Sequence, residues 1–443
     1  TVLLKNENNA LPLSKDETQK LSLLGFSSYY PVQGGDMGSS LNENKGTDAD
    51  TVDMVQAFEA KGYSLNPTVQ NMYLGMKEDF KSEAVLPWGV TTYYRATSPA
   101  IGGTFTSLEP SQEKLDKAEP TWKDSMNDYN VMIVTIARAA GENTNYTPGE
   151  EGVNPEQNLN QADPLGLSDT ERATIDAAVK AKEQNGGKVI VLLNNASAME
   201  IDELKNNDGI DAMLEVGIPG GYGFYGVADV LSGDANPSGH LADTYAVDNS
   251  ASPAAQNYGD YEWTNADSDY SINSEIVEAE SIYTGYKYYE TRYADTVLGQ
   301  GNASDSVGSS TGGAWTYDSE VSYPFGYSLS YTTFTQTLDS LNVDLEKKTV
   351  TAEVTVTNTG DVAGKDVVQL YASTPYTDYD KEHLVEKAAV QLLDYEKTDE
   401  LAPGESTKVT ITADAQDMAS WDSTAANEAG TTGNYILDAG DYY

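Results

Sequence analysis

The chain has 443 residues, of which 39% are aliphatic or aromatic, so it is long enough for two or three domains with sizeable cores. The 70 acidic residues outnumber the 26 lysines and arginines, and this net charge of −44 disfavours nucleic acid and anionic lipid as partners. Cysteine is absent and only two histidines occur, which excludes disulfides, thiol catalysis and a histidine-rich metal site. Because no apolar run reaches the ~20 residues of a membrane span and no calcium-loop pattern occurs, we expect no membrane span, metal or cofactor.

Residues 1–245 alternate short apolar runs with helical patterns, which is typical of a layered α/β domain. Continuous apolar runs suit parallel strands that are buried on both faces, and we predict them at 21–26, 131–136, 188–195 and 212–216. Helices are predicted over 48–62, 168–187 and 220–234. The helix over 168–187 begins with a Ser168–Glu171 capping box and ends in Gly-Gly.

Two further segments follow. Residues 246–335 are rich in Asn, Asp, Ser, Gly and Tyr, and we interpret them as an extended connection with a few ordered anchors such as 283–293. From 336 to 443 apolar and polar residues alternate around turn-rich breaks at 358–364 and at Pro403-Gly404. This spacing predicts an all-β sandwich of about 100 residues.

A polar loop of about thirty residues follows the predicted strand 131–136, before helical patterning returns at Ser168. Ligands of open α/β sheets bind beyond the carboxyl ends of the strands, and long loops in compact domains are usually functional or disordered. Glu142 lies near the start of this loop, so it is a candidate for chemistry, although a solvated acidic residue is the common case in a chain with 70 of them.

A glycine-rich stretch over 31–40 follows the predicted strand 21–26 and contains Ser39. It lacks the Gly-Lys-Ser/Thr ending of a phosphate-binding loop as well as the G-x-G-x-x-G spacing, and Asp36 would repel a phosphate. Nucleotide binding is therefore disfavoured, whereas the backbone and Ser39 could approach a neutral ligand.

Several stretches together resemble glycoside hydrolase family 3. They are TVLLKNENNALPL (1–13), IARAAGEN (136–143), LSDTE (167–171), VIVLLNN (189–195), the long segment 211–245 and YPFGYSLSYTTF (323–334). The sandwich over 336–443 is similar to the fibronectin type III-like domain of that family. The resemblance covers nearly the whole chain, and the order of the matches carries more weight than the short Gly-Glu motif.

The resemblance implies a retaining glycosidase, most simply an exo-acting β-glucosidase, in which an Asp nucleophile on a (β/α)8 barrel works with a Glu acid/base on the α/β sandwich. Glu142 matches the acid/base motif. Ser39 falls in a loop that can approach sugar hydroxyls, with an inserted Met37 beside it, and Arg138 either orients the acid/base loop or pairs with an acid. An oligosaccharide or β-glucoside is the implied substrate.

The barrel itself is not recognisable in these 443 residues, since eight βα units need about 250 residues. We therefore expect the barrel on another chain or on a missing segment, and a homo-oligomer of the assembled enzyme is left open. The Tyr-rich 246–335 region and the 323–334 signature are expected to pack against the barrel. The alternative for the signature is an internal clamp between the two domains of this chain.

Two rival interpretations remain open. One is a non-catalytic carbohydrate-binding or scaffold protein of the same fold, and the other is a β-xylosidase of the same family. The acidic balance and the lack of cysteine fit a bacterial protein inside or outside the cell, with a slight preference for the cytoplasm.

Overall fold

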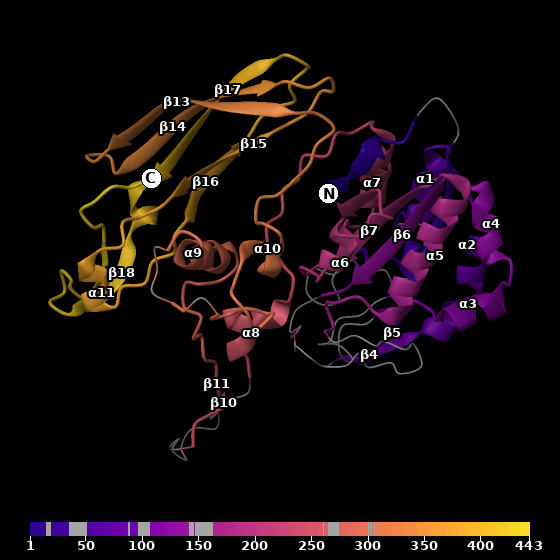
Figure 1. Cartoon of the computed structure of the whole chain (residues 1–443), viewed down its shortest axis with the longest axis horizontal. Helices are drawn as coiled ribbons and strands as arrows, with labels where there is room; N and C mark the ends of the chain where they lie inside the picture. Colours follow the sequence, from indigo (N-terminus) through magenta and orange to yellow (C-terminus); the bar gives the residue numbers. More distant parts are fainter. Residues whose placement is uncertain are drawn as a thin grey trace. The chain divides into compact units, whose positions relative to one another are not determined.

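The computed structural model describes residues 1–14, 19–34, 51–86, 89–95, 107–140, 146, 163–259, 261–264, 274–299, 301, 303–304 and 306–443. These residues form two compact units (Figure 1). Unit 1 comprises residues 1–249 and 326–331, and unit 2 comprises residues 250–325 and 332–443. The three-part division at 245 and 335 stays a prediction.

Unit 1 is built on a six-stranded sheet with the strand order β1-β8-β7-β6-β2-β3. All neighbours in this sheet are parallel except β1, which pairs antiparallel with β8 at one edge. The central strands β6 and β7 are buried along almost their whole length, which explains their continuous apolar sequences. The strands of unit 1 are β1 (Val2–Asn6), β2 (Lys20–Leu24), β3 (Ser64–Leu65), β4 (Ser82–Leu86), β5 (Gly89–Tyr93), β6 (Val131–Arg138), β7 (Lys188–Asn195), β8 (Ala212–Glu215) and β9 (Tyr245–Ala246).

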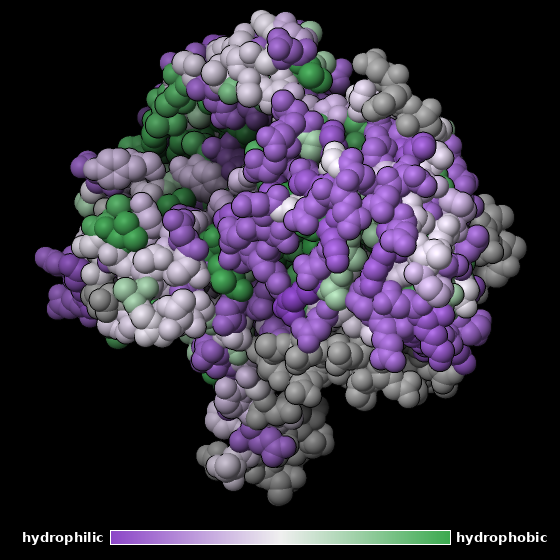
Figure 2. Space-filling model, turned by 45° about the vertical axis from the view of Figure 1, so that its right-hand side comes forward, coloured by the Kyte–Doolittle hydropathy of each residue, from purple (hydrophilic) through white to green (hydrophobic). Residues whose placement is uncertain are grey.

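The helices of unit 1 are α1 (Met54–Ala60), α2 (Pro67–Gly75), α3 (Gln112–Ala118), α4 (Trp122–Ser125), α5 (Asp169–Asn185), α6 (Asp202–Lys205) and α7 (Gly223–Ser232). Helix α4 packs on α2 and α5, α2 packs against β2, α5 packs against β6 and β7, and α1 packs on α7 (Figure 1). The predicted capping box of α5 is present, because the Ser168 hydroxyl accepts from the Glu171 N–H while the Glu171 carboxylate accepts from the Ser168 N–H. Hydrophilic residues cover most of the face of this unit that Figure 2 shows.

Unit 2 begins with short elements and continues into antiparallel sheets. The short elements are α8 (Pro253–Asn257), β10 (Tyr261–Glu262), β11 (Ser274–Glu275), α9 (Tyr286–Thr296), α10 (Tyr317–Glu320) and β12 (Val321–Tyr323). The sheets contain β13 (Phe334–Asp344), β14 (Thr349–Asn358), β15 (Val367–Ala372), β16 (Gln391–Lys397), β17 (Ser406–Asp414), β18 (Ser420–Ala426) and β19 (Thr432–Ile436), with α11 (Asp378–His383) after β15.

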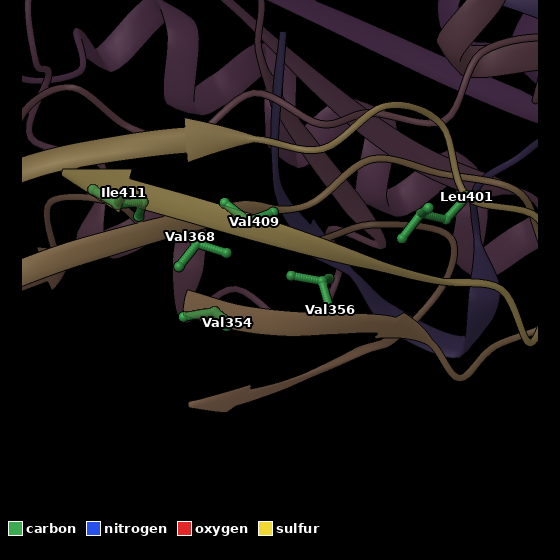
Figure 3. Packing of buried hydrophobic residues seen from close by; sticks show 6 residues of the cluster. All are labelled: Val354, Val356, Val368, Leu401, Val409 and Ile411. Atoms are coloured by element: carbon green, nitrogen blue, oxygen red, sulfur yellow. The ribbon is translucent and has the colours of Figure 1, made fainter. Parts of the chain in front are cut away.

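The β-rich part of unit 2 has its own hydrophobic core. Strand β14 pairs with β13 and β17, strand β15 pairs with β16, and strand β18 pairs with β19. Every second residue of β14 is buried, as the alternating sequence predicts. Side chains from β14, β15, β17 and the loop before β17 point toward one another (Figure 3), namely Val354, Val356, Val368, Leu401, Val409 and Ile411. The predicted fold class, an α/β domain followed by an all-β part, is confirmed.

Lys387 lies in a buried charge cluster that joins α11 to the C-terminal residues of unit 2. Its ammonium donates to Asp380 (2.9 Å), to the Pro375 carbonyl (2.8 Å) and to Asp438. The Asp380 side chain is fully buried. Because removing one partner of a buried ion pair leaves an uncompensated charge, we expect Lys387→Met to lower the free energy of unfolding by ~3–5 kcal/mol in urea titrations.

Lys381→Met is the matched control for this prediction. Lys381 pairs with Asp378 at 3.2 Å on the same helix, but both side chains are exposed. Its removal should therefore cost ~0.5 kcal/mol or less. Equal small effects of the two substitutions would contradict the structural role assigned to Lys387.

Candidate functional site

The carboxyl ends of β2, β6, β7 and β8 meet at one edge of the sheet, because these strands run parallel to one another. This is the edge at which open α/β sheets bind their ligands. Two of the three predicted site residues, Ser39 and Glu142, follow β2 and β6 in the sequence, and both lie outside the described residues. The described residues at the edge are those that hold the ends of the segments that contain Ser39 and Glu142.

Arg138, the third predicted site residue, is the last residue of β6 and is completely buried. All five of its N–H groups donate within the chain. Nε donates to the Pro164 carbonyl (3.0 Å), and the terminal nitrogens donate to the carbonyls of Ala137 (2.8 Å) and Gly166 (2.7 Å). They also donate to both carboxylate oxygens of Glu171, at 2.7 and 2.9 Å.

These contacts tie the end of β6 to the residues that immediately follow the segment 141–162. Burial alone would raise the pKa of Glu171, but the Arg138 guanidinium and the Ser168 hydrogen bonds outweigh it and hold this pKa below its usual value. The geometry favours the interpretation that Arg138 pairs with an acid and positions the segment. Direct substrate binding by Arg138 stays a prediction.

The ends of the segment 35–50, which contains Ser39, are held by two side-chain amides. Asn194, fully buried near the end of β7, accepts from the Val32 N–H (2.7 Å) and donates to the carbonyls of Val32 (2.8 Å) and Gly217 (2.7 Å). Gln33 donates through its side chain to the Val52 carbonyl at 2.7 Å. The two ends of this segment are thus fixed to each other and to the carboxyl edge of the sheet.

Acidic side chains with raised pKa values lie beside the end of the 141–162 segment. The Tyr146 hydroxyl donates a hydrogen bond to one carboxylate oxygen of Asp163. The other oxygen accepts from the Leu165 N–H at 2.8 Å. Burial, followed by the charge of Asp163, raises the pKa of Glu200 to about 8, and Glu200 accepts from the Asn249 N–H at 2.8 Å. A proton can therefore be held here near neutral pH.

Glu215 ends β8 and is also buried at this edge. It accepts from the Tyr245 hydroxyl (2.9 Å) and from the Gly217 N–H (2.7 Å). Burial raises the pKa of Glu215 to about 8. The polar side-chain atoms of Asn195, the last residue of β7, are also buried beside Glu215 and Tyr245. Polar groups thus line the carboxyl ends of three neighbouring strands.

The segment 326–331, the centre of the 323–334 signature, belongs to unit 1 and contacts its β1 and α7. Tyr327 donates its hydroxyl to the Leu4 carbonyl (3.2 Å), Leu329 pairs with the backbone of Leu3 (2.9 Å), and Tyr331 donates to the Val230 carbonyl (2.9 Å). These contacts all lie within unit 1, and the interpretation of the segment as a clamp between the two domains stays a prediction. Packing against a barrel stays a prediction.

Sequence reasoning missed Asn194, Gln33, Glu200 and Glu215 as supports of the site. A signal was present for Asn194 and Glu215, because each is the second-last residue of an apolar run, KVIVLLNN and AMLEV, at the carboxyl edge. Within the described ranges, no cluster of three or more His, Asp or Glu side chains is arranged to hold a metal ion. In the same ranges, no helix combines the length and apolarity that a membrane crossing requires.

Glu215 gives a pH prediction. Burial raises its pKa in the folded state to about 8, above the 4.5 of an exposed glutamate, so the folded state binds more protons than the unfolded state between these values. The contribution of Glu215 to stability is then fully present below about pH 4.5, is lost as the pH rises toward 8 and changes no further above it. We expect Glu215→Gln to remove a fall on the order of 3 kcal/mol from urea unfolding measured between pH 5 and pH 8.5.

Glu59→Gln, at an exposed position of α1, serves as the control and should leave the pH profile unchanged. If Glu215→Gln leaves the slope of stability against pH unchanged as well, then Glu215 is ionised in the folded chain and the assignment is wrong.

The Arg138–Glu171 pair gives a second prediction for this site. Arg138→Met leaves the buried Glu171 carboxylate without its positive partner and should lower the free energy of unfolding by ~3–5 kcal/mol. The double variant Arg138→Met/Glu171→Leu replaces both charges and should be more stable than the single variant. A double-mutant cycle measured by urea unfolding checks this, and strictly additive losses would refute the pairing.

Comparison with known proteins places these features in a family. Residues 1–331 match the model of the glycosyl hydrolase family 3 C-terminal domain, and residues 366–442 match a fibronectin type III-like domain. Beta-glucosidase A of Butyrivibrio fibrisolvens is 28% identical over all of this chain and 47% of its own length. A beta-glucosidase of Ruminococcus albus is 29% identical over all of this chain and 37% of its own length. The chain thus spans less than half of either relative.

Solved structures agree with this assignment. A beta-glucosidase from Paenibacillus barengoltzii superposes on the whole chain with a TM-score of 0.69 and 25% identity, over 39% of its own chain. Beta-glucosidase 3B from Thermotoga neapolitana, solved with α-D-glucose, superposes with a TM-score of 0.66 and 25% identity, over 53% of its own chain. The resemblance predicted from the sequence motifs is confirmed. The chain belongs to glycosyl hydrolase family 3, as its C-terminal domain followed by a fibronectin type III-like domain.

Proposed function

We propose that this chain is the non-barrel part of a retaining, exo-acting β-glucosidase that hydrolyses terminal β-D-glucosyl residues. Glu142 supplies the general acid/base, and the Asp nucleophile comes from a (β/α)8 barrel on another chain or segment. The observation that carries this proposal is that the chain aligns over its entire length with beta-glucosidases more than twice as long.

The chemistry needs two carboxyl groups about 5–5.5 Å apart on opposite sides of the glycosidic bond. In the first step the nucleophile attacks the anomeric carbon while Glu142 gives its proton to the departing oxygen. In the second step Glu142, now a carboxylate, takes a proton from the water that cleaves the glycosyl-enzyme bond. Glu142 must therefore hold a proton near neutral pH and regain it in every cycle.

The anchoring of both segment ends supports this role for Glu142. An acid/base group must be held close to a productive geometry while its segment extends toward a second domain. The ends of that segment must therefore be anchored rigidly. Arg138 holds Pro164 and Gly166 at the root of the acid/base segment. Asn194 holds Val32 at the root of the segment that contains Ser39, which in this proposal approaches sugar hydroxyls.

The first experiment is native mass spectrometry of the purified protein, combined with an aryl β-glucoside assay on the same sample. A barrel-sized chain bound to this one, with activity, supports the proposal. A lone and stable species of 47.7 kDa should be inactive, and activity that returns when a family 3 barrel is added would support the same conclusion. Hydrolysis by the lone chain would overturn the proposal that the nucleophile lies on a separate barrel.

The assembled enzyme gives a direct prediction for Glu142. Glu142→Ala should lower kcat by about 10²–10⁴-fold on glucosides with poor leaving groups, because these need protonation. The loss should be much smaller on activated aryl glucosides, and azide should restore turnover as a glucosyl azide of retained configuration. Steady-state kinetics over a series of leaving groups measure this dependence.

Glu150→Ala, in the same loop, is the matched control and should leave the leaving-group dependence unchanged. A loss of activity in Glu142→Ala that is independent of the leaving group, without azide rescue, would transfer the acid/base role to another residue.

A further inference from the structure

An exposed aromatic pair lies on the β18–β19 hairpin of unit 2, far along the chain from the acid/base segment. Trp421 and Tyr435 are 53% and 58% exposed, although both are large rings that are usually covered in folded proteins. They are directly opposite each other in the strand register, and their rings meet edge to face at 5.1 Å with an interplanar angle of 69°. Strand pairing thus fixes the two rings on one face of the hairpin.

The absence of a side chain at Gly433 makes room for the Trp421 indole beside it. A Cβ at residue 433 would lie 2.7 Å from Cζ2 and 3.0 Å from Cη2 of Trp421, so any side chain there would push the indole outward. Gly433 also has a φ of +103°, which other residues rarely adopt. A glycine inside a strand weakens the strand and often marks a close approach of a ligand or backbone. Here it leaves the outer face of a fixed indole open.

The size and charge of the pair favour a small, flat and neutral ligand. Two half-exposed rings offer roughly 200 Å² of contact, well below the ~800 Å² that each partner contributes to a typical protein–protein interface. The net charge of −44 disfavours anionic polymers. The faces of aromatic rings carry negative charge density, so they attract the weakly positive axial C–H groups of a β-glucopyranosyl ring.

We propose that Trp421 and Tyr435 form a binding platform for a neutral β-linked glucan chain. In this platform one glucosyl ring stacks on the open face of Trp421, and the next contacts Tyr435. The choice of ligand class rests on the proposed β-glucosidase function, but the binding requires neither Glu142 nor a barrel. The platform would raise the local concentration of substrate chains near the enzyme without taking part in the chemistry.

The test measures binding by the full 443-residue chain. Affinity gel electrophoresis in a soluble β-1,3/1,4-glucan, supported by titration calorimetry with cellopentaose, should show retardation and millimolar or tighter binding. Trp421→Ala should weaken binding at least tenfold. Trp421→Tyr keeps a stacking face and should retain most of the binding, and Gly433→Ala, which displaces the indole, should weaken it.

Trp263→Ala is the matched control, since Trp263 is equally exposed (54%) on the separate β10–β11 hairpin, and it should leave binding unchanged. Absence of retardation of the unaltered chain, or equal losses for the two tryptophans, would overturn the proposal. A change of oligomeric state in Trp421→Ala by light scattering would also overturn it, because the pair would then serve a protein contact. Hydrolysis by the assembled enzyme is measured separately, so that failure of the platform leaves the proposed function standing.

Discussion

The organisation of unit 1 depends on the buried Arg138–Glu171 pair. The Glu171 carboxylate accepts from the Arg138 guanidinium at 2.7 and 2.9 Å and from the Ser168 N–H at 2.9 Å. It therefore neutralises the positive charge of Arg138 at the end of β6 and also caps the N-terminus of α5. Arg138 in turn holds the backbone that leads out of the 141–162 segment. The end of a parallel strand, the residues 164–166 and the start of the crossover helix are therefore held together at one point.

The sequence predicted the local half of this arrangement. The Ser168–Glu171 capping box follows from residue types three positions apart, and the apolar runs of β6 and β7 follow from burial on both faces. The pairing of Glu171 with Arg138 joins residues 33 positions apart, and no local pattern encodes it. The antiparallel placement of β1 beside β8 was missed for the same reason, since it joins Val2 to Glu215. Which distant segments pair with each other is decided by how the whole chain packs, and not by local sequence patterns.

The candidate site shows the same division between local pattern and packing. Its location at the carboxyl edge follows from the topology of parallel strands, whereas the roles of Glu142 and Ser39 came from resemblance to the family and not from the residues alone. The amides that hold the segment ends could not be ranked from sequence, because Asn194 looks like an ordinary strand-ending residue. Only the folded chain brings its amide to both the N–H and the carbonyl of Val32, which is 162 residues away.

The scarcity of cations explains how the other buried acids are held. With 26 lysines and arginines for 70 acids, few carboxylates can be given a positive partner in the interior. Glu171 is paired with Arg138, and the pKa of Glu171 is lowered as a result.

Glu109, in contrast, accepts from the Phe26 N–H and from the hydroxyls of Tyr73 and Thr174, and burial raises the pKa of Glu109 to about 7. Glu200 and Glu215 are likewise held by neutral donors, with pKa values of about 8. Neutral donors cannot offset the cost of burying a full charge, so the pKa values of these carboxyls are raised to neutral pH or above it. An acid-rich interior of this kind suits a domain whose proposed catalytic group must also hold a proton until the leaving group takes it.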